Sequence, residues 1–141
     1  MTLKPLNTHT DAPWKQWFRA SSIAWSKVAA ANPQRGLVCT NKDGIYQLYG
    51  WEVETGKLTR LTDQPAGVVS GLISADGRYV YYHRDERGNE IGHYVRVPFE
   101  GGEAEDVSPE LSPYASFFID QSHSGKVTGF LTAGASGFEI Y

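Results

Sequence analysis

A pattern that recurs at one spacing along the chain restricts the fold more than any other feature of this sequence. Residues 48–62 resemble residues 94–108, which lie 46 positions further on. Under this shift the matched pairs are Gly56 with Gly102, Leu61 with Val107, and Thr62 with Ser108. Self-similarity at a period of about 20 to 50 residues is the signature of a repeat protein, whose units cannot bury their apolar faces alone.

The same shift extends the repeat in both directions. The further matches are residues 72–74 with residues 118–120, and Tyr94-Val95 with Ile140-Tyr141 at the end of the chain. The units that this period predicts are residues 22–62, residues 68–108 and an incomplete third at residues 115–141. Residues 1–21 form a lead-in, in which residues 12–19 have the pattern of a short helical or irregular segment.

Each repeat contains four short extended segments separated by turn residues. In the clearest copy these segments are residues 68–74, 78–84, 91–99 and 103–107. Asp76-Gly77 and Gly101-Gly102 supply the positive φ that tight hairpin turns need. Residues 79–82 are apolar or aromatic at every position, so we expect both faces of that strand to be covered.

Four antiparallel strands in a repeat of about 40 to 50 residues match one blade of a β-propeller. The sequence therefore predicts an all-β fold. We expect a partial β-propeller of about two and three-quarter blades, each a four-stranded antiparallel sheet. Because propellers close with about four to eight blades, we expect the chain to be part of a longer protein.

Composition and charge narrow the class of protein. With 40% hydrophobic and 21% charged residues, the chain has the composition of a globular protein. Its 13 basic and 16 acidic residues give a net charge of −3, whereas nucleic-acid-binding surfaces carry a basic excess. No apolar run approaches the roughly 20 residues that span a bilayer, and the first residues lack the apolar core of a signal peptide. We expect no contact with nucleic acid or membrane, and a cytoplasmic location.

The sequence offers few groups for catalysis or for a cofactor. Cys39 is the single cysteine, which excludes an internal disulfide and a multi-cysteine metal site, and its apolar neighbours predict a buried thiol. A nucleophile elbow needs Gly-x-Ser-x-Gly, and the nearest strings, at residues 67–71 and 134–138, lack that spacing. We therefore expect no catalytic residue and no cofactor in this chain.

Two histidines and two acidic residues lie close together in the sequence, and such residue types can hold a metal. They are His83, Asp85, Glu90 and His93. If the loop holds an even number of residues, such as 85–90, then Arg84 faces Ile91 and the two histidines point to opposite faces of the sheet. A loop with an odd number would bring them together. Because zinc sites need three or four convergent ligands, we expect no metal here.

The acidic loop between the second and third strands of the middle unit is the candidate contact site for a peptide substrate or a neighbouring domain. Its residues are Asp85, Glu86, Arg87, Asn89 and Glu90. Surface hairpin tips are usually polar, so the plain alternative is a solvated loop.

Strand reversal also predicts where this loop lies. It should share one face with residues 63–67 and 109–113, while the turns at residues 76–77 and 101–102 lie opposite. The carboxylates would make that face acidic, and they could attract the amino terminus of a peptide. The competing expectation is that they pair with the local arginines, Arg84 and Arg87, at under about 1 kcal/mol for each pair.

The repeat resembles a known type of propeller. The motifs similar to the TolB-type propeller repeat are Tyr46-Gln47-Leu48-Tyr49-x-Trp51-x-x-x-Thr55-Gly56-x-Leu58-x-x-Leu61-Thr62 and Ser74-x-Asp76-Gly77-Arg78-Tyr79-Val80. Ala75 stands where that repeat usually has proline. Two more motifs look more particularly like the N-terminal propeller of prolyl oligopeptidase family serine peptidases. They are Asp85-Glu86-x-Gly88-Asn89-Glu90 and Val97-Pro98-x-Glu100-Gly101-Gly102.

The resemblance covers residues 22–141 and implies a function for the intact protein. Such enzymes hydrolyse peptide or acyl-peptide bonds with a Ser-His-Asp triad on an α/β-hydrolase domain that follows the propeller, and no part of that domain is in this sequence. The propeller would be a non-catalytic filter for peptide substrate, with the α/β-hydrolase domain as its partner. The alternative is a TolB-like propeller that binds protein partners and carries no enzyme.

Two further expectations concern apolar side chains. Trp14, Trp17, Phe18 and Trp25 should form a cluster that packs against the first unit or a following domain, because aromatic residues dominate cores and interfaces. A propeller that stops after about three blades leaves an apolar sheet face and an unpaired edge at residues 138–141. We therefore expect the chain to associate in solution.

Overall fold

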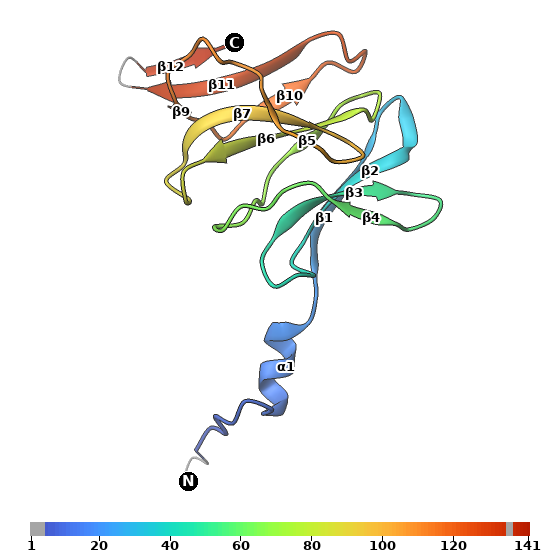
Figure 1. Cartoon of the computed structure of the whole chain (residues 1–141), viewed down its shortest axis with the longest axis vertical. Helices are drawn as coiled ribbons and strands as arrows, with labels where there is room; N and C mark the ends of the chain where they lie inside the picture. The colour runs from blue at the N-terminus through green and yellow to red at the C-terminus, as the bar shows by residue number, and fades with distance from the viewer. Residues whose placement is uncertain (1–4, 135–136) are drawn as a thin grey trace.

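The computed structural model describes residues 5–134 and 137–141, and its sheets are built of antiparallel strands (Figure 1). Within these residues it has one helix, α1 (Pro13–Arg19), which precedes the first strand. No helix in the described ranges has both the length and the apolar character needed to cross a membrane. The all-β prediction is confirmed.

The first unit is a sheet of four strands, each paired antiparallel with the strand that precedes or follows it in the sequence. Its strands are β1 (Ile23–Ala29), β2 (Asn32–Thr40), β3 (Gln47–Glu52) and β4 (Leu58–Arg60). The hairpin turn predicted around Gly56 is present, because Gly56 has a φ of 72° and its N–H donates to the Glu52 carbonyl.

The second and third units repeat this order. The second unit contains β5 (Leu72–Ile73), β6 (Tyr79–Asp85), β7 (Ile91–Pro98) and β8 (Glu105–Asp106). The third contains β10 (Ile119–Gln121), β11 (Thr128–Gly134) and β12 (Gly137–Ile140). Between them, β9 (Tyr114–Ala115) pairs with both β7 and β11, so the two units form one hydrogen-bonded sheet.

Hydrogen bonds recur at the spacing found in the sequence. The Leu61 N–H donates to the Leu48 carbonyl at 2.9 Å, and the Val107 N–H donates to the Tyr94 carbonyl at 3.0 Å. The donor and the acceptor of the second bond each lie 46 positions after those of the first. The period read from the sequence is therefore a repeat of backbone geometry.

One of the sequence matches is wrong by two positions, because it pairs Ser74 with Asp120. The Ser74 N–H donates to the Tyr79 carbonyl, and the equivalent bond in the third unit joins the Ser122 N–H to the Val127 carbonyl. Ser122 lies 48 positions after Ser74. The connection that leads into the third unit is two residues longer than its counterpart, so the shift increases from 46 to 48 there.

Side chains of the middle unit alternate between its two faces and so contact both neighbouring units. The cluster shared with the first unit contains Leu37, Cys39 and Leu48 on one side and Val80, Tyr82, Val95 and Val97 on the other. The cluster shared with the third unit contains Tyr94, Tyr114 and Phe130. Val80, Tyr81 and Tyr82 are all buried, which confirms that both faces of this strand are covered.

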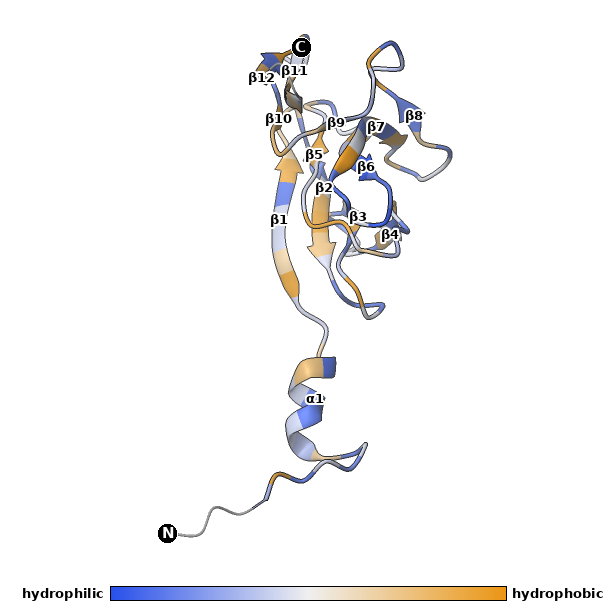
Figure 2. Cartoon of the chain, turned by 90° about the vertical axis from the view of Figure 1, so that its left-hand side faces the viewer, coloured by the Kyte–Doolittle hydropathy of each residue, from blue (hydrophilic) through white to orange (hydrophobic). Residues whose placement is uncertain are grey.

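The lead-in does not pack as the sequence suggests. Helix α1 stands away from the sheets (Figures 1 and 2), and Trp17 and Phe18 are 84% and 81% exposed. Local bonds explain this, because Trp14 Nε1 donates to the Asn7 carbonyl and holds the helix against its own preceding segment. Trp25 lies apart from the helix and packs against the core of the first two units. The expected packing on the first unit is therefore confirmed for Trp25 and wrong for Trp17 and Phe18.

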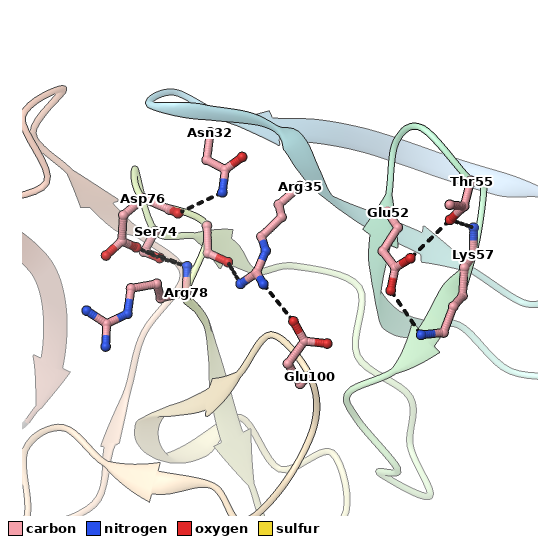
Figure 3. Close-up of polar contacts among 10 residues, drawn as sticks. Asn32, Arg35, Glu52, Thr55, Lys57, Ser74, Asp76, Arg78 and Glu100 are labelled. Atoms are coloured by element: carbon pink, nitrogen blue, oxygen red, sulfur yellow. Dashed lines mark hydrogen bonds and ion pairs between the residues drawn. The ribbon is translucent and has the colours of Figure 1, made fainter.

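The hairpin turns of the first two units meet at one end of the sheets, around Arg35 (Figure 3). Its guanidinium donates to the Gly77 carbonyl at 3.1 Å and to the Glu100 carboxylate at 2.6 Å. It also lies 4.6 Å from the centre of the Phe99 ring. One side chain of the first unit thus contacts two turns of the second, and we call this end of the molecule the turn face.

We expect Arg35→Ala to lower the free energy of unfolding by about 1 to 2 kcal/mol, because it removes two hydrogen bonds and a cation–π contact between units. Glu100→Gln, which removes the charge of an exposed partner, should cost under about 1 kcal/mol. Urea denaturation of the two variants measures both values. Equal losses would show that the ion pair alone carries the effect, contrary to this expectation.

Candidate functional site

The loop that joins β6 to β7 lies beside both inter-unit connections, opposite the turn face. Gln64 and Pro113, from the two connections, line a cavity of about 480 Å³ together with Glu86 and Asn89 of the loop. The placement predicted for residues 63–67, 85–90 and 109–113 on one face is confirmed. We call this surface the loop face.

A second and larger cavity of the loop face has a volume of about 720 Å³. Its walls are residues 66–70 of the first connection, residues 115–117 after the second connection, and the loop. The loop residues that line it are Asp85, Arg87, Gly88 and Glu90, with His83 of β6 beside them. All five candidate residues therefore border these cavities. Glu86 and Asn89 border the smaller one, Arg87 and Glu90 border the larger one, and Asp85 borders both.

Two of the candidate residues hold the shape of the loop. The Asp85 carboxylate accepts hydrogen bonds from the N–H groups of Gly88 and Glu90, at 3.3 and 2.8 Å. The Asn89 side-chain oxygen accepts from the N–H groups of Glu86 and Ile91, at 3.2 and 3.0 Å. Asp85 and Asn89 thus have a structural part in the loop, which leaves Glu86, Arg87 and Glu90 as the side chains free to meet a ligand.

The loop backbone is unusual at the residues that carry these charges. Arg87 and Glu90 have φ values of 57° and 62°, in the region that non-glycine residues rarely adopt, and Gly88 between them has a φ of 84°. The carboxylate of Asp85 stabilises this conformation through its two hydrogen bonds. The directions of the Arg87 and Glu90 side chains are therefore set by a fixed backbone.

Among the described residues, the expected pairing of the loop-face carboxylates with Arg84 and Arg87 is absent, and one of these carboxylates pairs with a different arginine. Asp63 pairs with Arg60 at 2.5 Å. In residues 5–134 and 137–141, no ion pair within 4.0 Å joins Glu86 or Glu90 to Arg84 or Arg87. The carboxylates of Glu86 and Glu90 are therefore available to solvent or to a partner.

A buried polar network positions the first connection. Gln47, which is fully buried, donates from Nε2 to the Gln64 carbonyl at 2.7 Å and accepts from the Thr62 hydroxyl at 2.7 Å. Buried polar groups are stable only when they are hydrogen-bonded, and each of these has a partner. The network fixes the segment that leads from β4 to the cavity.

Sequence reasoning missed the apolar residues of the larger cavity. Val69 and Phe117 line it and are 65% and 74% exposed. They lie 48 positions apart. The equivalent turn residues Ser74 and Ser122 have the same spacing, so Val69 and Phe117 occupy equivalent places in successive connections. The 46-residue shift used for the sequence pairs Val69 with Ala115 instead, which hides this match.

The two histidines lie near one aromatic ring but not at one metal site. His83 pairs across the hairpin with Tyr94, and Arg84 pairs with His93. The predicted placement of the histidines on opposite faces is confirmed, but the register is wrong, because Arg84 was expected to face Ile91. The last pair of the hairpin is Asp85 with Gly92, one residue later on each strand than the predicted pair of Arg84 with Ile91. No group of three or more metal-binding side chains occurs in the part of the chain that the structure describes.

The two sequence strings nearest to Gly-x-Ser-x-Gly are residues 67–71 and 134–138, and the structure describes the first in full and the second in part. Gly67 has a φ of 85° and lies in the connection between β4 and β5, and Ser70 borders the larger cavity. In the second string, residues 135 and 136 lie outside the described residues.

Comparison with known proteins identifies the fold. No family model matches the chain. Atu1656, an uncharacterized protein of Agrobacterium fabrum, is 28% identical over 101 residues, which are 72% of this chain and 33% of that protein. The structure of a putative TolB from Agrobacterium tumefaciens has 24% identity and a TM-score of 0.62, over 84% of this chain and 41% of that one. TolB from Acinetobacter baumannii has 18% identity and a TM-score of 0.56, over 86% of this chain and 29% of that one.

These comparisons support a TolB-like propeller fold. The chain spans about a third of the length of its relative Atu1656 and less than half of either TolB. The expectation of TolB-type repeats is confirmed at the level of the fold. The expectation of a prolyl oligopeptidase receives no support, since neither structural neighbour is described as a peptidase.

Proposed function

We propose that this chain is part of a TolB-like propeller that acts as a protein-interaction module and carries no enzyme activity. In this proposal the first two units are complete blades, and the third unit supplies three strands of another. The binding surface is the loop face, where connections from successive units gather around the cavity of about 720 Å³.

The observation that carries the proposal is the pair of exposed apolar side chains in that cavity. Val69 and Phe117 lie at equivalent places in two successive connections, and each is more than half exposed. Large apolar side chains that stay exposed and gather in a cavity mark binding sites for proteins or other ligands. Arg87 and Glu90 add one charge of each sign to the same cavity, as expected at the polar rim of a protein interface.

The experiment is selection of peptides from a random dodecapeptide library on the 141-residue chain. We expect the selected peptides to bind at least about tenfold more weakly to a Val69→Ser, Phe117→Ser variant, since two apolar contacts are lost. Glu103→Gln, an exposed position near the turn face, is the matched control and should bind as the parent does. Selected peptides that bind the double variant with unchanged affinity would place the binding surface elsewhere and refute the proposal.

The peptidase reading stays an untested prediction. It requires an α/β-hydrolase domain with Gly-x-Ser-x-Gly several hundred residues further along the reading frame. In that case Glu86 and Glu90 would be the residues to test, by comparing free-amine with N-blocked peptides in the enzyme and in its Glu→Gln variants. A reading frame that ends once the propeller closes would support the interaction module.

A further inference from the structure

One position of the repeat touches the backbone where the chain passes from one unit to the next. In the first unit, Cys39 Sγ lies 3.7 Å from the Val68 carbonyl oxygen. In the second unit, His83 Nε2 lies 3.0 Å from the Tyr114 carbonyl oxygen. Val68 and Tyr114 lie 46 positions apart, which is the period of the repeat.

Strand pairing shows that Cys39 and His83 are equivalent residues. Cys39 pairs across its hairpin with Leu48, and His83 pairs with Tyr94. Leu48 and Tyr94 again lie 46 positions apart. Two successive units therefore use the same position to contact the connection that follows, but one uses a thiol and the other an imidazole.

The two side chains respond differently to pH. Burial raises the pKa of the Cys39 thiol, which therefore stays neutral at and below neutral pH. An imidazole changes its charge between about pH 5 and 8 in ordinary surroundings. The second connection therefore contacts a side chain, His83, that can become charged in this range. The first connection contacts Cys39, which cannot.

Burial opposes a positive charge on His83, whereas several polar neighbours favour one. Its ring packs edge-on against Tyr94 at 5.2 Å and lies 5.6 Å from the ring of Tyr114. Burial is the largest influence and lowers the pKa of His83, and His93 of β7 acts in the same direction. The Tyr114 carbonyl, the Gly92 backbone and Asp85 favour the charged form but do not outweigh burial. Arg87 and Glu90 are the other charged residues that border the same cavity.

We propose that protonation of His83 loosens the connection between the second and third units and thereby makes the loop-face cavity sensitive to pH. In the neutral ring Nε2–H donates to the Tyr114 carbonyl, because a carbonyl oxygen can only accept, and Nδ1 carries no proton. Acidification adds a proton from water at Nδ1. The charged ring is then better solvated when residues 114–117 move away from it. The consequence for binding rests on the proposed function, whereas the loosening itself does not.

The direction of the pH effect follows from the lowered pKa of His83. Above the ordinary value of 6.5 the ring is neutral in both the closed and the open arrangement, so pH has no effect there. As the pH falls below 6.5 the open arrangement takes up the proton first, and the closed one loses stability until its own lower pKa is reached. Between these two values opening should increase by up to about tenfold for each pH unit.

Hydrogen exchange measured by mass spectrometry on the 141-residue chain tests this. Protection factors, corrected for intrinsic exchange at each pH, should fall several-fold for residues 114–117 between pH 7.5 and pH 5. Those for residues 68–70, beside Cys39, should not change. Equal pH dependence of the two segments would overturn the proposal.

Three variants isolate the imidazole. His83→Gln keeps a donor for the Tyr114 carbonyl but cannot titrate, so protection of residues 114–117 should become independent of pH. His93→Gln, at the other histidine near the Tyr114 ring, is the matched control and should retain the dependence. Cys39→His should introduce a pH dependence at residues 68–70. A pH dependence that persists in His83→Gln would overturn the proposal.

A direct titration covers the case in which these variants fail to fold. Nuclear magnetic resonance of the unaltered chain should place the pKa of His83 below 6.5. A pKa at or above 6.5 would mean that the closed arrangement tolerates the charge, and the proposal would be wrong.

Discussion

Leu48→Ala is expected to lower the free energy of unfolding by about 2 to 5 kcal/mol. Leu48 is fully buried in the cluster between the first and second units. Packing around it is tight, since a Cβ atom added at Gly71 would lie 2.5 Å from Leu48 Cδ1. Removing a buried leucine side chain loses its transfer free energy and leaves a cavity. The total free energy of unfolding of a domain is about 5 to 15 kcal/mol, so this loss is a large share of it.

Urea denaturation followed by circular dichroism measures this loss. Leu6→Ala is the matched control, because Leu6 is 67% exposed and the same atoms are removed from water-accessible surface. We expect that control to change the free energy of unfolding by less than about 0.5 kcal/mol. A similar small change for Leu48→Ala would show that the interface between the two sheets contributes little to stability.

The strands of this chain were predictable because their signals are local or strictly periodic. Asp76-Gly77 marks a turn whatever surrounds it, and Gly77 has the positive φ of 72° that such a turn requires. The shift of 46 positions identifies Leu48 and Tyr94 as equivalent, and their backbone carbonyls accept equivalent hydrogen bonds. These features depend on a few neighbouring residues and on the repeat itself.

The errors arose where hydrogen bonds from single side chains to nearby backbone decide the outcome. The register of the middle hairpin differs from the prediction because Asp85 pairs with Gly92, and its carboxylate accepts hydrogen bonds from two N–H groups of the loop. The position of the helix depends on Trp14, which bonds to its own preceding segment instead of to the first unit. A hydrophobic pattern does not predict the hydrogen-bond partners of Asp85 or Trp14.

The candidate site was predictable in part. Strand reversal alone places the loop and the two connections on one face, because successive strands run in opposite directions. The cavity residues Val69 and Phe117 were not predicted, because exposure of an apolar side chain depends on the units around it. A two-residue difference in the connections also concealed their equivalence.

The third unit has an exposed apolar face. The equivalent face of each of the first two units is covered by the unit that follows it. Leu48, Tyr94 and Ile140 are equivalent in successive units, because they pair across their hairpins with Cys39, His83 and Leu131. Leu131 lies 48 positions after His83, which is the shift into the third unit. Leu48 and Tyr94 are 0% and 4% exposed, because the following unit packs on them, whereas Ile140 is 82% exposed. Phe118 and Val127, which line a groove of about 350 Å³ with Ile140, are also more than half exposed.

We therefore expect the 141-residue chain to associate in solution, and Ile140→Asp to weaken this association by at least about tenfold. A contiguous exposed apolar surface favours association, and a carboxylate placed in it loses hydration when a second molecule covers it. Sedimentation velocity over a range of protein concentrations measures the change. Leu6→Asp places the same charge at a leucine of the lead-in that is 67% exposed, and it should leave the association unchanged. If Leu6→Asp weakens the association and Ile140→Asp does not, the lead-in segment is the contact and the uncovered sheet face is not.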